Sequence, residues 1–217
     1  MNILYEDADI IVCHKPAGIA SQSDRSFLPD MVSQIRNYLA SSQKNVRQIP
    51  YVGVVHRLDK PVEGILVYGK NKKATAALSK EIMAGGSITK LYEATVKGLL
   101  PVSDTPTTLT DYLLFDKQKN ISTVVEKDTK DAKKAVLEYQ VVHQDILKDG
   151  TKVTKLKIHL HTGRHHQIRV QLSHLGYPIV GDAKYGDPQL SHFPLMLCAC
   201  ALTFKHPTSG KTMHFQL

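Results

Sequence analysis

The run HRLD at 56–59 brings an imidazole, a guanidinium and a carboxylate within four residues of one another. It lies between two short apolar runs, 52–55 and 65–68, whose β-branched residues and bordering turn residues are typical of buried strands. Charge presented from a loop between rigid strands is a common way to build a site. Asp59 is therefore our leading candidate for a catalytic carboxylate, although an Asp before Lys-Pro is also a frequent turn residue.

A partly buried carboxylate needs a nearby cation to stay ionised. Arg57 can supply one locally. Arg169 can supply one from the basic segment TGRHHQIR at 162–169. In that segment Gly163 leads into a predicted amphipathic helix, whose N-terminal part carries Arg164, His165, His166, Gln167 and Arg169 and which ends near Gly176. At an effective dielectric near 20, such a contact pair has about 4 kcal/mol of Coulomb energy. A purely structural ion pair is the alternative interpretation.

Two further segments alternate as strands do, and these place polar side chains on defined faces. In SITKLYEATVKG, at 87–98, Lys90 and Tyr92 share one face. In KLKIHLH, at 155–161, His159 and His161 share a face with the lysines.

Histidines at 159, 161, 165 and 166 raise the question of a metal site, because H-x-H on a strand directs both rings to one face. No carboxylate lies near them in the sequence, and lysines and arginines crowd the segment, which disfavours a dication. We therefore expect no metal, and a phosphate-facing surface explains the cluster better.

Two common enzyme signatures fail. GILVYGKN at 64–71 nearly matches a phosphate-binding loop, but Asn71 replaces the Ser or Thr that would bind magnesium, and ILVY forms a strand run instead of a backbone cradle. A G-x-S-x-G motif is absent from the sequence. These observations argue against an NTPase and a serine hydrolase.

The composition is that of a basic globular protein. Among 217 residues, 28 Lys and Arg against 20 Asp and Glu give a net charge of +8, which suits an anionic partner, with nucleic acid first and an acidic membrane surface second. There is no signal-peptide pattern and no apolar run of the roughly 20 residues that span a bilayer. Three cysteines without a C-x-x-C pattern favour a reducing cytoplasm. We expect a cytoplasmic monomer.

Strand and helix patterns are interspersed along the chain, and hairpins recur. This order predicts an α+β fold with a mixed, largely antiparallel sheet and flanking helices, not a doubly wound parallel sheet. We expect one catalytic domain over residues 1–217, with the Thr-, Asp- and Lys-rich region 101–134 as a peripheral hairpin or insertion.

The run HRLDKPVEGILVYGK resembles the HRLD motif of the RluA-type pseudouridine synthases. Three further segments agree in the expected order, YEDADIIVCHKPAGI, KLYEATVKG and TGRHHQIRVQLSHLGYPIVGDAKYG. The resemblance covers nearly all of the chain. It implies isomerisation of uridine to pseudouridine in ribosomal or transfer RNA, with neither cofactor nor metal. The small S4-like RNA-binding module of several relatives is not expected here.

The same resemblance implies roles for individual residues. Asp59 corresponds to the essential aspartate, a nucleophile toward ribose C1′ or base C6 of a flipped uridine. Tyr92 corresponds to the tyrosine that packs on the base and assists proton removal from C5, and Arg169 to the basic partner of the aspartate. Arg57 and Arg164 correspond to positions that contact the RNA backbone or fill the space that the flipped base leaves. Lys90, on the same face of its strand as Tyr92, is assigned to RNA binding with them.

Val62-Glu63 departs from the Thr-Ser that follows HRLD in many members of the family. Glu63 adds a negative charge close to Asp59. This departure motivates an alternative function, a non-catalytic RNA-binding protein that has kept the synthase fold.

Overall fold

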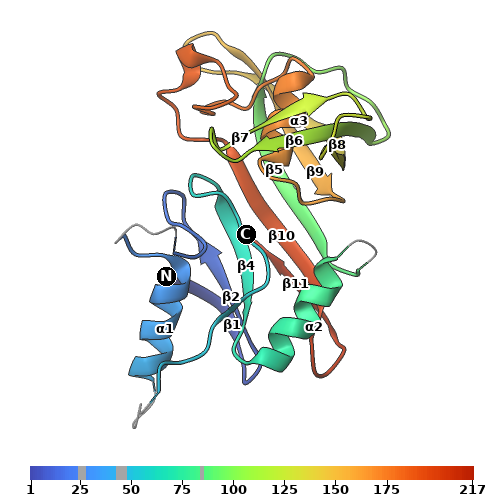
Figure 1. Ribbon diagram of the computed structural model, residues 1–217. Coiled ribbons are helices and arrows are strands. Elements are labelled where there is room, and N and C mark those ends of the chain that lie inside the picture. Colours follow the sequence, from blue (N-terminus) through green and yellow to red (C-terminus); the bar gives the residue numbers. More distant parts are fainter. Residues whose placement is uncertain (24–27, 43–47, 84–85) are drawn as a thin grey trace. The chain divides into compact units, whose positions relative to one another are not determined.

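The computed structural model describes residues 1–23, 28–42, 48–83 and 86–217, and these form two compact units (Figure 1). The first unit comprises Met1–Thr89 and Ala199–Leu217, and the second comprises Lys90–Cys198. The described residues contain three α-helices and eleven strands. Within them, no helix has the length and apolar character needed to cross a membrane.

The first unit contains two helices and the strands of both chain ends. In chain order its elements are β1 (Asn2–Glu6), β2 (Ile10–Lys15), α1 (Met31–Ser41), β3 (Gly53–Val54), β4 (Glu63–Gly69), α2 (Lys72–Ile82), β10 (Leu197–Lys205, in this unit from Ala199) and β11 (Thr212–Gln216). The strands follow the order β1-β2-β4-β10, with β3 on β4 and β11 on β10. The pairs β1–β2, β2–β4, β3–β4 and β10–β11 are antiparallel.

Strand alternation and helix capping explain this unit. Apolar residues of β2, β4, α2 and β10 form one core cluster: Ile10, Val12, Ile65, Val67, Ala74, Leu78, Leu202 and Phe204. Asp30, predicted as a helix cap, accepts a hydrogen bond from Ser33 N at 3.1 Å and begins α1. Asn71 begins α2 in the same way, through Ala74 N at 2.8 Å.

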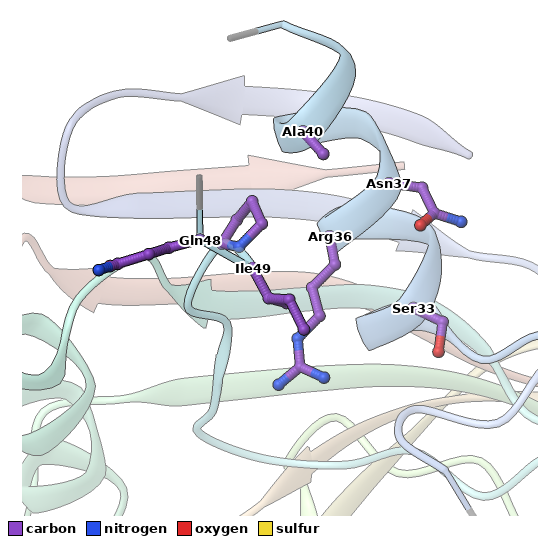
Figure 2. A pocket seen from close by; sticks show the side chains of 7 residues that line it. Ser33, Arg36, Asn37, Ala40, Gln48 and Ile49 are labelled. Atoms are coloured by element: carbon purple, nitrogen blue, oxygen red, sulfur yellow. The ribbon is translucent and has the colours of Figure 1, made fainter. Parts of the chain in front are cut away.

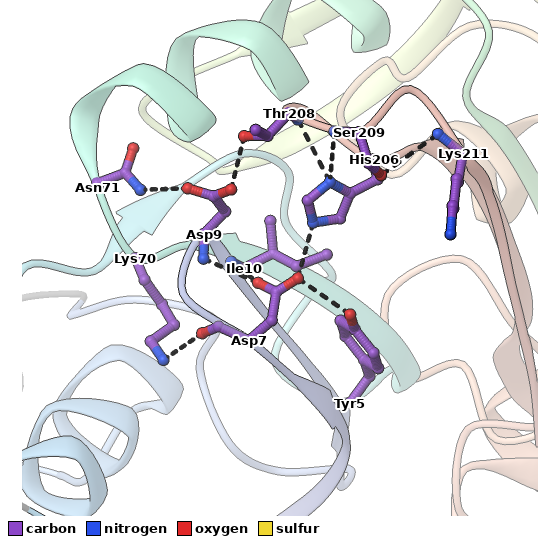
Figure 3. A network of polar contacts seen from close by, with 10 residues as sticks. All are labelled: Tyr5, Asp7, Asp9, Ile10, Lys70, Asn71, His206, Thr208, Ser209 and Lys211. Atoms are coloured by element: carbon purple, nitrogen blue, oxygen red, sulfur yellow. Dashed lines mark hydrogen bonds and ion pairs between the residues drawn. The ribbon is translucent and has the colours of Figure 1, made fainter.

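A polar network joins the β1–β2 turn to the β10–β11 turn (Figure 3). Asp7 accepts hydrogen bonds from Tyr5 Oη, Asp9 N, Ile10 N and His206 Nε2, at 3.0, 2.8, 2.9 and 2.8 Å. His206 Nδ1 accepts from the backbone N–H groups of Thr208 and Ser209, so the ring proton is on Nε2 and points to Asp7. Burial alone would raise the pKa of Asp7, but these donors outweigh it and lower that pKa.

The second unit is an antiparallel sheet with one short helix. Its elements are β5 (Thr89–Lys97, in this unit from Lys90), β6 (Thr107–Asp116), β7 (Ile121–Val125), β8 (Lys133–Ile146), β9 (Lys152–Leu160), α3 (Gln167–His174) and a 3₁₀ turn at Pro188–Leu190. The strand order is β5-β9-β8-β6-β7, and every neighbouring pair in it is antiparallel. In the region 101–134, β6 and β7 therefore form a hairpin that pairs with β8.

The mixed, largely antiparallel sheet predicted from the sequence is confirmed. Alternation on β9 also holds, since Leu156, Ile158 and Leu160 are buried. Whether residues 1–217 act as one catalytic domain stays a prediction.

Candidate functional site

Asp59 lies half-buried in the loop between β3 and β4, and backbone contacts hold that loop from both sides. Val62 N donates to Asp59 O at 3.0 Å and closes a turn directly after the carboxylate. Leu58 is buried, and its backbone exchanges two hydrogen bonds with Ser21 Oγ, at 3.0 and 2.8 Å. Tyr68 Oη donates to Ser21 O at 2.9 Å, so β4 supports Ser21 in turn. The backbone on both sides of Asp59 is thus held in place by hydrogen bonds.

The other two charged groups of HRLD have different surroundings. His56 Nε2 accepts a hydrogen bond from Val67 N at 3.2 Å, which makes this ring a support between the loop and β4. The side chain of Arg57 is exposed. An exposed guanidinium beside Asp59 in the chain is suited to phosphate contact, and RNA binding by Arg57 stays a prediction.

Lys15 supports the loop that carries Asp59, and the sequence reasoning missed it. It is fully buried, and its ammonium donates to Pro16 O, Ile19 O and Lys60 O at 3.0, 2.7 and 3.1 Å. Three carbonyls match the three donors of an ammonium. Burial lowers the pKa of Lys15 to about 8, although the negative charges of Asp59 and Glu63 partly offset this effect. Lys15 therefore fixes the residue that follows Asp59 and adds a titratable cation near it.

In the second unit, Tyr92 is 7% exposed on β5, on the same face as buried Ala94 and Val96. The predicted alternation of this strand is confirmed. Lys90 is half-buried, and burial lowers its pKa. Its ammonium lies close to Gly163, in the segment that leads to α3. Base stacking by Tyr92 and RNA binding by Lys90 stay predictions.

The helix predicted to carry Arg164 in its N-terminal part begins later than expected, so the prediction of its start was wrong. α3 spans Gln167–His174, and Arg164 to His166 form a turn before it. His166 has φ 54° and ψ 24°, a left-handed conformation that ends this turn. The predicted stop at Gly176 holds, since its N–H bonds to Ser173 O and the next N–H bonds to Leu172 O, both at 3.0 Å.

Arg169 forms a buried ion pair with Asp182, a second residue that the sequence reasoning missed. Nε donates to Oδ2 and Nη2 to Oδ1, both at 2.7 Å. The guanidinium carbon also lies 5.2 Å from the centre of the Tyr185 ring, within cation–π distance. Asp182 and Tyr185 thus orient the guanidinium from two sides.

Asp182 is itself held by the loop that carries it. Its Oδ1 accepts the N–H groups of Lys184 and Tyr185, at 2.9 and 3.1 Å. Burial alone would raise the pKa of Asp182, but Arg169 and these N–H groups outweigh it and lower that pKa. Gly181 has φ 78°, and a Cβ there would meet Pro194 O at 2.1 Å, so the turn before Asp182 requires glycine.

The six predicted site residues are divided between the units. Asp59 and Arg57 belong to the first, and Lys90, Tyr92, Arg164 and Arg169 belong to the second. Arg164 is exposed, and its Nε donates to Lys134 O at 2.9 Å. Each missed residue lies in a motif quoted above, Lys15 in HKPAG and Asp182 in GDAKYG. The sequence offered two signals for them, a lysine at the end of an apolar strand and an aspartate directly after a glycine.

A carboxylate from another strand lies beside two of the histidines, which the sequence around them did not indicate. Glu138 of β8 lies opposite His159 of β9, and its carboxylate is 3.9 Å from His159 Nδ1 and 3.2 Å from His161 Nε2. A carboxylate therefore accompanies these histidines, although it is distant in the sequence. His165 and His166 lie elsewhere, stacked on each other at 3.7 Å between ring centres.

A pocket of ≈ 470 Å³ lies in the first unit between α1 and residues 48–50 (Figure 2). Arg36, Asn37 and Ile49 are among its lining residues. None of the six predicted site residues lines it.

Comparison with known proteins identifies the class. The RNA pseudouridylate synthase family matches residues 9–174. An uncharacterized RNA pseudouridine synthase of Aquifex aeolicus is 32% identical over 230 residues, covering 100% of this chain and 69% of that protein. Ribosomal large subunit pseudouridine synthase D of Pseudomonas aeruginosa is 32% identical over 235 residues, covering 100% and 67%. Dual-specificity RNA pseudouridine synthase RluA of Vibrio parahaemolyticus is 33% identical over 211 residues, covering 96% and 79%.

Solved structures show the same fold. Human RNA Pseudouridylate Synthase Domain Containing 1 matches with a TM-score of 0.77 at 22% identity, covering 100% of this chain and 82% of that one. Human RNA Pseudouridylate Synthase Domain Containing 4 matches with a TM-score of 0.75 at 20% identity, covering 100% and 87%. The chain belongs to the RNA pseudouridylate synthase family and is an RNA pseudouridine synthase of the RluA type, an isomerase.

Proposed function

We propose that this protein converts specific uridines of ribosomal or transfer RNA to pseudouridine, with Asp59 as the nucleophile. The observation that carries the proposal is the HRLD loop, in which backbone contacts on both sides hold a half-buried aspartate. Breaking and remaking a glycosidic bond requires such a positioned carboxylate. Attack at ribose C1′ and attack at base C6 are both compatible with it.

The remaining predicted residues take roles around the flipped nucleotide. A uridine inside a stacked helix is out of reach, so the enzyme must extrude it. Tyr92 stacks on the extruded base and assists proton removal from C5. Arg169 is the cation for the carboxylate of Asp59. Arg57, Arg164 and Lys90 contact the RNA backbone or the space that the base leaves. This reaction uses neither a cofactor nor a metal ion.

The substrate class follows from charge and relatives. A net charge of +8 suits RNA held by its phosphates. Two relatives carry the names ribosomal large subunit pseudouridine synthase and dual-specificity RNA pseudouridine synthase. From these names we propose ribosomal RNA as the first substrate to test and transfer RNA as the second. We propose further that the protein acts as a monomer in the cytoplasm.

The decisive variant is Asp59→Asn, which removes the nucleophile and keeps the shape of the side chain. We expect turnover of the target RNA to fall by roughly 10⁴-fold or more, with RNA affinity nearly unchanged. Asp128→Asn, at an exposed position of the second unit, is the matched control and should retain full activity. Full activity in Asp59→Asn would refute the proposal.

The substrate is found by mapping pseudouridine across total RNA from cells with and without the gene. We expect one or a few sites to disappear on deletion and to return with the wild-type gene but not with the Asp59→Asn copy. An unchanged map, together with RNA binding by the purified protein, would favour the non-catalytic RNA-binding alternative.

A further inference from the structure

Three potential metal ligands converge on the β8–β9 ladder, outside the six proposed site residues. Glu138 and His159 are directly opposite each other in the antiparallel register, and His161 is the first residue after the end of β9. One ligand atom of each of the three residues lies within 4.8 Å of the other two. The two imidazole rings are 4.2 Å apart at their centres, so both present a nitrogen to the same small volume.

The geometry is close to that of a tetrahedral metal site. Zinc binds imidazole nitrogen and carboxylate oxygen at about 2.0–2.2 Å, which places neighbouring ligands about 3.3–3.5 Å apart. The carboxylate of Glu138 is 3.2 Å from His161 Nε2 and 3.9 Å from His159 Nδ1. The three ligand atoms lie within 4.8 Å of one another, so side-chain movement of about 1 Å would bring them to the spacing of a bound ion.

The local charge is mixed, because Lys90 acts electrostatically on His159 against a bound cation, whereas Glu138 acts in favour of one. Glu138 contributes a negative charge, whereas no carboxylate lies close to these histidines in the sequence itself. Lys155 and Lys157 share one face of β9. Lys155 is ion-paired with Glu93 at 2.7 Å, which compensates the charge of Lys155. The carboxylate at the centre of the cluster argues against an RNA phosphate as the ligand, because it would repel that phosphate.

We propose that Glu138, His159 and His161 bind one divalent transition-metal ion, for which Zn²⁺ is the probe. Two imidazoles and one carboxylate select a borderline ion of this kind over Mg²⁺ or Ca²⁺, which prefer oxygen ligands alone. The three side chains are between about a third and two fifths exposed, at 37%, 37% and 35%, which leaves room for water to complete the coordination. The ion would link β8 to β9 and takes no part in the isomerisation.

The test is a titration of the full chain with Zn²⁺ after removal of metals by a chelator, followed by calorimetry. We expect one equivalent to bind, and His161→Ala and Glu138→Gln each to weaken binding by at least about tenfold. His143→Ala is the matched control, because His143 lies on β8, 3.8 Å from Asp145, with both side chains largely exposed. It should bind Zn²⁺ as the wild type does.

Co²⁺ supplies an independent readout. A three-ligand site with water should give visible absorption bands that disappear in His161→Ala and persist in His143→Ala. Circular dichroism of each variant establishes that it is folded. Absence of Zn²⁺ binding to the wild type, or equal binding by all four proteins, would overturn the proposal.

Discussion

Lys15 in the first unit and Asp182 in the second are both buried charged residues beside a residue assigned to the reaction, but they are stabilised differently. Lys15 donates to three carbonyl oxygens, one of which belongs to the residue after Asp59. Asp182 binds the guanidinium of Arg169 in bidentate geometry. Dipoles satisfy the donors of Lys15, whereas a full opposite charge satisfies Asp182.

The difference appears in the titration of each group. Burial lowers the pKa of Lys15 to about 8, within reach of ordinary conditions. Burial would raise the pKa of Asp182, yet the pair with Arg169 and two backbone N–H groups lowers it. The charge of Lys15, which is hydrogen-bonded to carbonyls and only partly offset by Asp59 and Glu63, can be lost, whereas the charge of Asp182, which is paired directly with a counter-ion, persists. The support of Asp59 should therefore be sensitive to pH, and the support of Arg169 should not be at neutral pH.

Breaking the ion pair should give the largest effect. Asp182→Ala leaves the buried guanidinium of Arg169 without this carboxylate, which we expect to destabilise the protein by about 3–5 kcal/mol. Activity should fall as well, because Arg169 loses its orientation. Urea unfolding and RNA turnover measure the two effects. Asp187→Ala, which breaks the more exposed pair with Lys97, is the control and should cost much less. Equal losses in both variants would contradict the comparison.

Removing the lysine should have a smaller effect on stability and a clear effect on catalysis. Lys15→Met keeps the length of the side chain but leaves carbonyl oxygens of the loop without this donor. We expect this to lower the free energy of unfolding by about 1–3 kcal/mol. The loop that carries Asp59 should loosen, so kcat should fall more than RNA affinity. Lys72→Met, at an exposed position of α2, should change neither quantity. Unchanged kcat in Lys15→Met would show that the loop is fixed without it.

Much of this arrangement was readable from local sequence. Alternation predicted β5 and β9, a capping aspartate predicted the start of α1, and the HRLD run pointed to Asp59. These features depend on neighbours in the chain, which a single sequence displays. The prediction of where α3 starts was wrong because the apolar repeat begins only at Ile168. The polar residues before it carry no periodicity that could locate the start.

The supporting contacts could not be predicted, because each depends on non-local register. Glu138 meets His159 only through the pairing of β8 with β9. Asp182 meets Arg169 thirteen positions away in the sequence, and Lys15 meets the carbonyl of Lys60 forty-five positions away. Sequence motifs indicated which segments matter, whereas the partners of their charges required the folded chain.

The pH dependence of stability tests the comparison without disturbing the ion pair. The folded-state pKa of Lys15, about 8, lies below its ordinary value of 10.5, so the unfolded chain binds more protons between these values. The contribution of Lys15 to the free energy of unfolding should therefore rise as pH increases from about 8 to 10.5. Cys13, whose pKa burial raises to about 12, acts in the opposite direction, so wild type must be compared with Lys15→Met.

We expect the free energy of unfolding of the wild type, relative to Lys15→Met, to increase across this interval. Urea unfolding at pH 7, 8, 9 and 10 at constant ionic strength gives the difference. Over the same interval, kcat of the wild type should decline as the cation near Asp59 is lost. Parallel stability curves for the two proteins would show that the charge of Lys15 is not sensitive to pH in this range.

The smallest effect should come from Tyr185, which separates the orientation of Arg169 from its charge pairing. Tyr185 Oη is hydrogen-bonded to Ser122 N at 2.9 Å and to His166 Nδ1 at 2.8 Å. Tyr185→Phe removes these bonds and keeps the ring near Arg169, so we expect a loss of about 0.5–1.5 kcal/mol in stability with activity retained. Tyr185→Leu removes the cation–π contact as well, worth about 0.5–1 kcal/mol or more. If activity falls only in Tyr185→Leu, the ring of Tyr185 helps to orient the guanidinium of Arg169. If activity falls equally in both variants, the hydroxyl contacts of Tyr185 matter and Asp182 alone orients the guanidinium.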